Sequence, residues 1–160
     1  MDKADMKGNV CFEFFGKLGV PFFLFHDRDV APKAGSYRES AARLDDMIDA
    51  AAGKMEETGV RLLWGTANLF GHPRYAAGAA TNPDPEVFAY AAPQVTQVLE
   101  ATHRLKGQTY VLWGGREGYE TPPHTDLRRE AAPLGPFRSM VAAPNAKTGL
   151  QGPALLRSTP

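Results

Sequence analysis

The chain has 160 residues, a length typical of a single domain. Apolar residues make up 43% of it and charged residues 22%, so a packed core is expected and a disordered chain is excluded. Lysine and arginine together number 18, as do aspartate and glutamate, and this zero formal charge gives no global attraction for nucleic acid or an anionic membrane. We therefore expect neither as a partner.

Cysteine usage and the amino-terminal residues favour a cytoplasmic protein. A single cysteine, Cys11, cannot form an internal disulfide, and a reducing compartment explains this most simply. The first ten residues, MDKADMKGNV, lack the apolar segment of a secretory signal, and no apolar run is long enough to span a bilayer. We expect Cys11 to be a small buried apolar residue.

The amino-terminal segment predicts a helix over residues 8–18 and then a strand over Val20–Phe25. Gly19 ends the helix, and the apolar run after it is short enough for a strand. A loop over Asp27–Gly35 is expected next. The apolar residues at helical spacing are Val10, Phe14, Phe15 and Leu18.

The second helix carries the clearest signals in the chain. Ser36 and Glu39 form a capping box at its start, and Gly59 ends it. A strand over Val60–Trp64 follows. The apolar stripe of this helix is Leu44, Met47, Ile48, Ala51 and Met55.

A long loop over Gly65–Thr81 precedes the third helix. The segment Asn82–Pro85 supplies a polar cap and a proline for its first turn. Pro93 falls inside the helix, where it costs about 3 kcal/mol unless a kink absorbs it. Gly107 closes the helix, and Gln108–Trp113 is the third strand. The expected buried face is Val87, Phe88, Ala91, Val95, Val98, Leu99 and Leu105.

The remaining third is less regular. Thr125–Ala146 has helical spacing of apolar residues but is interrupted by prolines, so a broken helix is expected. Gly152–Leu156 is a short apolar run and a possible fourth strand. We treat residues 1–160 as one domain with a proline-rich, less regular part from about 131.

Strands that alternate with helices predict an α/β fold with a parallel sheet. The loops are long after each strand and short before the next one, which is typical of a (β/α)₈ TIM barrel of about 250 residues. The fold class is therefore a partial TIM barrel, about half, with four parallel strands. Its inner face would carry Phe22 or Phe23, Leu63 and Leu112, and such a face and its sheet edges favour completion or covering by oligomerisation.

Polar side chains that follow the strands predict the site, because the carboxyl ends of parallel strands carry the chemistry. His26 and Asp29 form either a catalytic pair or a simple loop cap. Trp64 and Trp113 lie beside glycines at strand ends, so they are either the walls of a rim pocket or ordinary core aromatics.

Several weaker patterns have ordinary explanations. The glycine-rich Trp113–Gly118 lacks the spacing of a phosphate-binding loop. Arg116 and Glu117 are expected to form an ion pair, and His103 is expected to be solvated on a helix. One speculative cation site remains, with ligands from Asp27, Asp29, Glu117 and His72.

Three long segments of the sequence resemble the longer-chain class of bacterial xylose isomerases. They are FEFFGKLGVPFFLFHDRD (Phe12–Asp29), GVRLLWGTANLFGHPRYAAGAATNPDPEVFAYAAPQV (Gly59–Val95) and YVLWGGREGYET (Tyr110–Thr121). The match is dense from Lys7 to Glu130 and thin as far as Leu156. It corresponds to the part of the barrel from the second to the fifth strand.

The resemblance implies an aldose–ketose isomerase acting on D-xylose and D-xylulose, and on D-glucose and D-fructose. Such enzymes open the sugar ring and move a hydride between C1 and C2 with two divalent cations, Mg²⁺, Mn²⁺ or Co²⁺. By this resemblance His26 assists ring opening and Asp29 holds its other ring nitrogen. The residues implied to line the sugar pocket are Trp64, Thr66, Phe70 and Trp113.

The carboxyl-terminal segment departs from the family pattern. Gly149–Pro160 aligns with the family's fifth strand and places Arg157 where a metal-binding glutamate belongs and Thr159 where a lysine belongs. An arginine is a permanent cation with donors only, so it cannot bind a divalent cation. The metal ligands are therefore unknown from the sequence.

Two functional hypotheses stay open. One is an active isomerase assembled from several copies, with metal ligands from non-standard residues or a neighbouring chain. The other is a catalytically degenerate oligomeric fragment that binds sugars weakly at most.

Overall fold

The computed structural model describes residues 3–117 and 154–158, together with positions 128, 132, 135, 136 and 139, each of which is helical. The rest of the predicted broken helix and of the proline-rich part lies outside the described residues. The elements in chain order are α1 (Lys3–Leu18), β1 (Phe22–His26), α2 (Asp27–Val30), α3 (Tyr37–Thr58), β2 (Arg61–Thr66), the 3₁₀ helix η1 (Pro73–Tyr75), α4 (Pro85–Arg104), β3 (Thr109–Gly114) and β4 (Ala154–Ser158).

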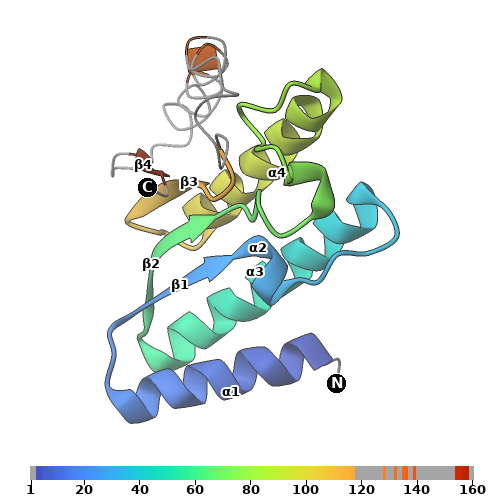
Figure 1. Cartoon of the computed structure of the whole chain (residues 1–160). Helices are drawn as coiled ribbons and strands as arrows, with labels where there is room; N and C mark the ends of the chain where they lie inside the picture. The colour runs from blue at the N-terminus through green and yellow to red at the C-terminus, as the bar shows by residue number, and fades with distance from the viewer. Residues whose placement is uncertain are drawn as a thin grey trace.

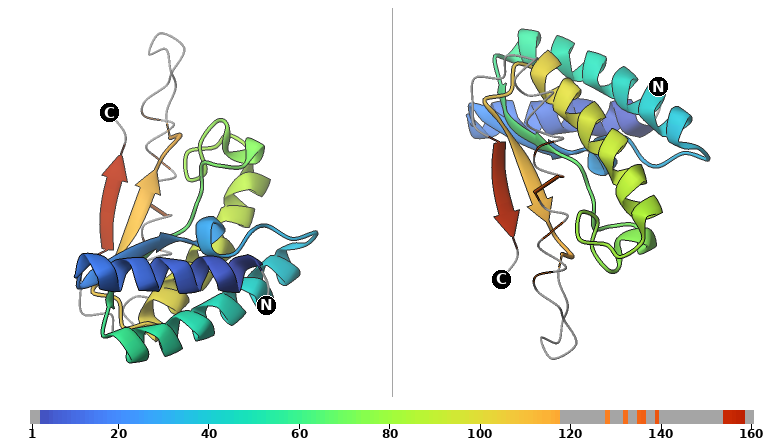
Figure 2. Two further views of the ribbon diagram at one scale, coloured as in Figure 1. Left: turned by 90° about the horizontal axis from the view of Figure 1, so that it is seen from below. Right: turned by 90° about the horizontal axis from the view of Figure 1, so that it is seen from above.

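The four strands form one parallel sheet in the order β1-β2-β3-β4, with β4 running beside β3 (Figure 1). Strands that follow one another in the chain are neighbours in the sheet. The long helices α1, α3 and α4 gather on one face of the sheet (Figure 2). This is the predicted arc of a (β/α)₈ barrel, and the fourth strand is confirmed.

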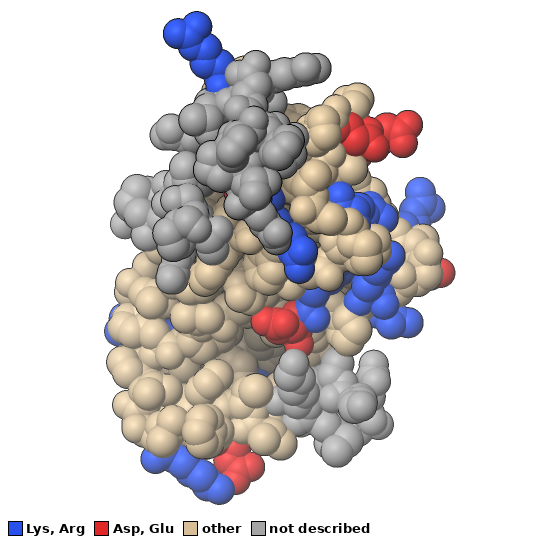
Figure 3. Space-filling model, viewed as in Figure 1, with Lys and Arg blue, Asp and Glu red and all other residues tan. Residues whose placement is uncertain are grey.

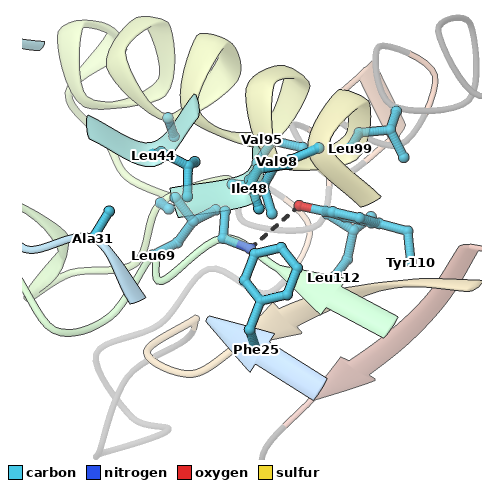
Figure 4. Packing of buried hydrophobic residues seen from close by; sticks show 14 of the residues in the cluster. Phe25, Ala31, Leu44, Ile48, Leu69, Val95, Val98, Leu99, Tyr110 and Leu112 are labelled. Carbon is cyan, nitrogen blue, oxygen red and sulfur yellow. Dashed lines mark hydrogen bonds between the residues drawn. The ribbon is translucent and has the colours of Figure 1, made fainter. Parts of the chain in front are cut away.

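The main core lies between the sheet and the helices (Figure 4). Leu62, Leu99 and Tyr110 are fully buried there, and the Tyr110 hydroxyl accepts a hydrogen bond from the backbone N–H of Ala67 at 3.3 Å. Gly65 allows this close packing, because a Cβ at that position would lie 2.3 Å from Thr102 Oγ1. The face of α4 predicted from periodicity is confirmed by its buried members, Ala91, Val95, Val98 and Leu99.

The amino-terminal helix buries a different set of residues from the one predicted. Phe12 is 6% exposed and packs edge-on against Phe15 and Phe23, with ring centroids 5.8 and 5.1 Å away. Phe15 belongs to the predicted stripe and takes part in this packing, but the stripe was wrong for its other three members, because β1 meets the side of α1 that carries Phe12 and Phe15. The exposed fractions are 64% for Val10, 56% for Phe14 and 58% for Leu18. Cys11 is half-buried, not fully buried.

Several predicted boundaries hold and others move. The capping box of Ser36 and Glu39 is present, and Gly59 ends α3 with a φ of 73°. The predicted loop over Asp27–Gly35 begins with the short helix α2. Pro93 lies within the continuous helix α4.

Of the side chains predicted for the face of the sheet away from the helices, Leu112 and Phe23 lie on the helix side instead. Leu112 belongs to the core between sheet and helices, and Phe23 packs on α1. Leu24 is instead half exposed. The reason is the phase of the alternation: Phe23 and Phe25 of β1 both pack with the core on the helix side, and so do Tyr110 and Leu112 of β3. A register shift between Phe23 and Leu24 leaves Leu63 of β2 without a register partner on β1.

Candidate functional site

His26 and Asp29 are brought together at the carboxyl end of β1. His26 is the last residue of the strand, and α2 begins at the next residue, so one short helical turn carries Asp29 back towards the ring. His26 Nδ1 lies 3.0 Å from Asp29 Oδ2. The imidazole is 20% exposed and the carboxylate 63% exposed, so the pair joins a shielded ring to a solvated anion.

Three aromatic side chains surround the His26 ring. The centroid of the His26 ring lies 6.2 Å from that of Trp64, 5.6 Å from that of Phe70 and 5.7 Å from that of Trp113. Phe70 and Trp113 are also 6.3 Å from each other. We call His26, Trp64, Phe70 and Trp113 the aromatic cage. The sequence placed these residues on three separate segments, and the structure gathers them at one rim.

The loop after β2 is shaped to bring Phe70 into the cage. Asn68 Oδ1 accepts hydrogen bonds from the backbone N–H groups of Phe70 at 3.3 Å and Gly71 at 2.7 Å, which forms a tight turn. Gly115 leaves room for the ring, because a Cβ there would lie 2.8 Å from the Phe70 side chain. The packing of Phe70 in the cage therefore requires glycine at position 115.

Two buried polar atoms at this rim lack a partner among the described residues. They are Nε2 of His26 and Oγ1 of Thr66. Thr66 is fully buried and is the register partner of His26 across β1 and β2, so the two residues lie side by side. A buried polar atom without a hydrogen bond costs free energy, and a hydroxyl-bearing ligand is the natural group to satisfy it.

The pairing with Asp29 determines what the His26 ring can do. A carboxylate accepts hydrogen bonds only, so it favours the tautomer with the proton on Nδ1. Nε2 then carries the lone pair, and it is the buried ring nitrogen without a partner among the described residues. A neutral imidazole with a free lone pair beside apolar walls is a general base for a hydroxyl proton.

A network around Asp27 supports the site from beneath, and sequence reasoning missed its role. Asp27 is 1% exposed and accepts hydrogen bonds from the backbone N–H of Asn68 at 2.7 Å and from Gln94 Nε2 at 2.8 Å. Tyr75 donates its hydroxyl proton to Gln94 Oε1 at 2.9 Å. These bonds join β1, the loop after β2, and α4.

Burial is the main cause of the raised pKa values in this network. It raises the pKa of Asp27 above its ordinary value, against the opposing effects of Asn68, Arg28 and Gln94. It also raises the pKa of the Tyr75 hydroxyl. The one sequence signal for this role was position, because Asp27 directly follows the strand that ends at His26.

Glu117 has a structural role different from the predicted ion pair with Arg116. Its carboxylate accepts hydrogen bonds from the backbone N–H groups of Ala79 at 2.9 Å, Ala80 at 3.1 Å and Thr81 at 2.9 Å. The Thr81 hydroxyl also bonds to it. Glu117 therefore fixes the loop between η1 and α4 to the end of β3.

The four residues of the speculative cation site do not come together. Asp27 is occupied by its own network, Glu117 by backbone donors, and Asp29 by His26. His72 lies beside Lys33, a cation. Among residues 3–117 and the other described positions, no group of three or more His, Cys, Asp and Glu side chains is arranged to hold a metal ion.

Arg157, at the position where the family pattern has a metal-binding glutamate, is part of β4. Arg157 lies on β4 opposite Trp113 in the sheet register, so the departure from the family pattern falls on a strand beside the cage. Thr159 lies outside the described residues. Within the described part of the chain, no helix has the length and apolarity to cross a membrane.

Curated proteins from several bacteria match the whole chain. A xylose isomerase of Chelativorans sp. (strain BNC1) is 59% identical over 160 residues, all of this chain. Xylose isomerases of Burkholderia cenocepacia and Escherichia coli O9:H4 are 56% and 57% identical over 100% and 98% of the chain. The chain spans only 36–37% of the length of these relatives. No family model matches it.

The fold also has a solved counterpart. The crystal structure of a 3-keto-D-glucoside 4-epimerase from E. coli matches 93% of this chain and 49% of its own, with a TM-score of 0.64. The two sequences are 15% identical, so this likeness shows the fold alone. It agrees with the partial barrel described above.

Proposed function

We propose that this chain, which belongs over its whole length to the xylose isomerase family, carries the ring-opening part of an aldose–ketose isomerase site. The substrates we propose are D-xylose and D-xylulose, with D-glucose and D-fructose as the six-carbon pair. The observation that carries the proposal is the His26–Asp29 pair: the imidazole is surrounded by three aromatic rings, and its Nε2 is buried with no hydrogen-bond partner among the described residues.

Ring opening follows from the groups that the site offers. His26 Nε2 takes the proton of the anomeric hydroxyl, the C1–O5 bond breaks, and the proton is returned to O5, which gives the open-chain aldehyde. Asp29 holds Nδ1–H throughout and stabilises the imidazolium that forms between the two transfers. The rings of Trp64 and Trp113 would pack on the apolar faces of the sugar and exclude water.

The described residues do not fit the two divalent cations that the family implies. Their carboxylates are engaged in the bonds given above, and Arg157 has no acceptor to offer a cation. We therefore derive no hydride-transfer step from this chain's described residues. We propose that the ligands for that step come from outside them, for example from a neighbouring copy.

A second candidate is a degenerate sugar-binding fragment without isomerase turnover. The arginine at position 157, on the strand beside the cage, is the observation that favours it. The two candidates share sugar binding and differ in metal-dependent isomerisation.

Two rates measured on the purified full chain test the proposal. Ring opening is followed as the mutarotation of α-D-xylose by polarimetry, and isomerisation as D-xylulose formation with and without Mg²⁺, Mn²⁺ or Co²⁺. We expect His26→Gln to lower both rates by about 100-fold and Asp29→Ala by about tenfold, because general bases contribute on that order. His103→Gln, which changes an exposed histidine of α4, is the matched control.

The outcomes separate the candidates. Metal-dependent isomerisation that is lost in His26→Gln and kept in His103→Gln supports the isomerase. Mutarotation without isomerisation in any of the metals favours the degenerate fragment. No acceleration of mutarotation by the unmodified chain would overturn the ring-opening role of His26.

A further inference from the structure

A hollow that includes none of the aromatic cage residues has Asp29 in its lining. Its volume is about 300 Å³, and it is formed by α2 and the loop after it, the loop after β2, η1 and the first half of α4. Three side chains that line it are permanent or near-permanent cations: Arg28, Lys33 and Arg74. We call it the basic hollow.

Two of the three cations of the basic hollow, Lys33 and Arg74, approach one imidazole. Lys33 Nζ lies 2.9 Å from His72 Nε2. The backbone N–H and the side-chain Nε–H of Arg74 approach His72 Nδ1 at 3.2 and 3.3 Å. A neutral imidazole has only one acceptor nitrogen, because the other one carries a proton. The ring therefore cannot satisfy both cations at once.

The charge of these groups is not balanced within the hollow. Arg28 Nε lies 3.4 Å from Oδ2 of the buried Asp27, and the Asp29 carboxylate is bonded to His26 Nδ1. In the described part of the chain no ion pair involves Lys33 or Arg74, and their proximity, after desolvation, lowers the pKa of His72. A concave site with two unneutralised cations attracts anions.

The arginine of the hollow is held ready for an oxyanion. The Arg74 guanidinium carbon lies 3.5 Å from the centroid of the Tyr90 ring, and this stacking restricts its plane. A planar guanidinium matches two oxygens of a phosphate, whereas Lys33 acts as a point charge. Figure 3 shows Lys and Arg side chains gathered where Figure 1 draws η1 and the start of α3.

We propose that the basic hollow binds a phosphate group, either free phosphate or the phosphate of a sugar ester. Three tetrahedrally placed oxygens can accept from Lys33 and Arg74 together, which the single acceptor of His72 cannot. This site stands apart from the proposed function, because neither cation contacts the cage. Its nearest link to the cage is Asp29, which lines the hollow and bonds to His26.

Titration calorimetry of the full chain at low ionic strength tests the site. The probes are inorganic phosphate, glucose 6-phosphate and, as the uncharged control, glucose. We expect saturable binding of at least one phosphate, weakened about tenfold in Lys33→Ala, because charge-assisted hydrogen bonds contribute on that order. Lys17→Ala removes the same charge from the exposed end of α1 and should bind as the unmodified chain does.

A second readout follows the imidazole itself. Bound phosphate should raise the pKa of His72, measured by NMR, because it offsets the cations that lower it. Saturation by inorganic phosphate identifies a free-phosphate site, and saturation by the ester alone identifies a sugar phosphate. The proposal is overturned if neither binds, or if Lys17→Ala weakens binding as much as Lys33→Ala.

Discussion

At the scale of single residues, the site depends on two histidines in opposite electrostatic settings. His26 pairs with a carboxylate, and its other ring nitrogen is buried among aromatic rings. His72 lies among cations and forms no ion pair with a carboxylate in the described part of the chain. From the sequence, His72 was predicted as a candidate metal ligand. Its neighbours in space show that it belongs to a basic hollow. The same residue type therefore supports a proton-transfer role at one position and an anion site at the other.

Asp27 makes a prediction about pH, since burial raises the pKa of its carboxyl above the ordinary 3.8. The folded chain then holds the proton more tightly than the unfolded chain does. The contribution of Asp27 to stability is fully present below pH 3.8 and is lost as the pH rises through the raised pKa. We expect the free energy of unfolding to fall over this window relative to that of Asp27→Asn, which keeps the shape but does not titrate.

Urea unfolding of both proteins from about pH 3.5 to pH 7 measures this difference. Asp46→Asn, which removes an exposed carboxylate of α3, reports the effect of losing a charge in general. A wild-type-minus-Asp27→Asn difference that stays constant across the window would contradict the prediction.

At the scale of elements, α1 shows how far a periodic pattern can mislead. The predicted stripe included Phe15, which does meet Phe23 of β1, but the other ring that meets Phe23 is Phe12, which was not predicted. The remaining members, Val10, Phe14 and Leu18, are exposed. The helix has aromatic or aliphatic residues on more than one side, so spacing alone did not identify the buried one. Contact with β1 decided which side packs.

This difference predicts unequal costs for two neighbouring substitutions. Phe12→Ala should destabilise the chain by about 3–5 kcal/mol, because it removes a buried ring and leaves a cavity. Phe14→Ala should cost less than about 1 kcal/mol, because its ring is already 56% exposed. Urea unfolding gives both values, and equal costs would mean that α1 packs by its predicted stripe.

At the scale of the whole molecule, the open face of the sheet and the edge of β1 are the features that a complete barrel would cover. Leu24 is half exposed at that edge, and Phe14 is exposed on the outer side of α1. Exposed apolar side chains of this size favour association. The predicted homo-oligomer therefore remains a prediction with two candidate surfaces.

Sedimentation velocity distinguishes the two surfaces. We expect the unmodified chain to self-associate and Leu24→Asp to raise the dissociation constant at least about tenfold, because an unpaired carboxylate would be buried. Phe14→Asp is the matched control and should associate normally. Dissociation by Phe14→Asp alone would assign the contact to α1 and would exclude the sheet face.

Much of the fold and part of the site followed from the sequence alone. Local patterns predict the order of strands and helices, the capping box and the barrel-like loop lengths. These features can therefore be predicted without knowledge of the packing. The pairing of His26 with Asp29 is also local, because one turn of helix separates them. Family resemblance named the other members of the cage.

Tertiary structure decided what depends on contacts between distant segments. Packing decided which residues of β1 and β3 face the helices, and Gln94 reaches Asp27 from 67 positions away in the chain. The carboxylate of Glu117 found backbone donors 36–38 positions earlier in place of its neighbour Arg116. Local propensities carry no information about such pairs, because which groups meet is determined only when helices and strands pack and each buried polar group must find a partner.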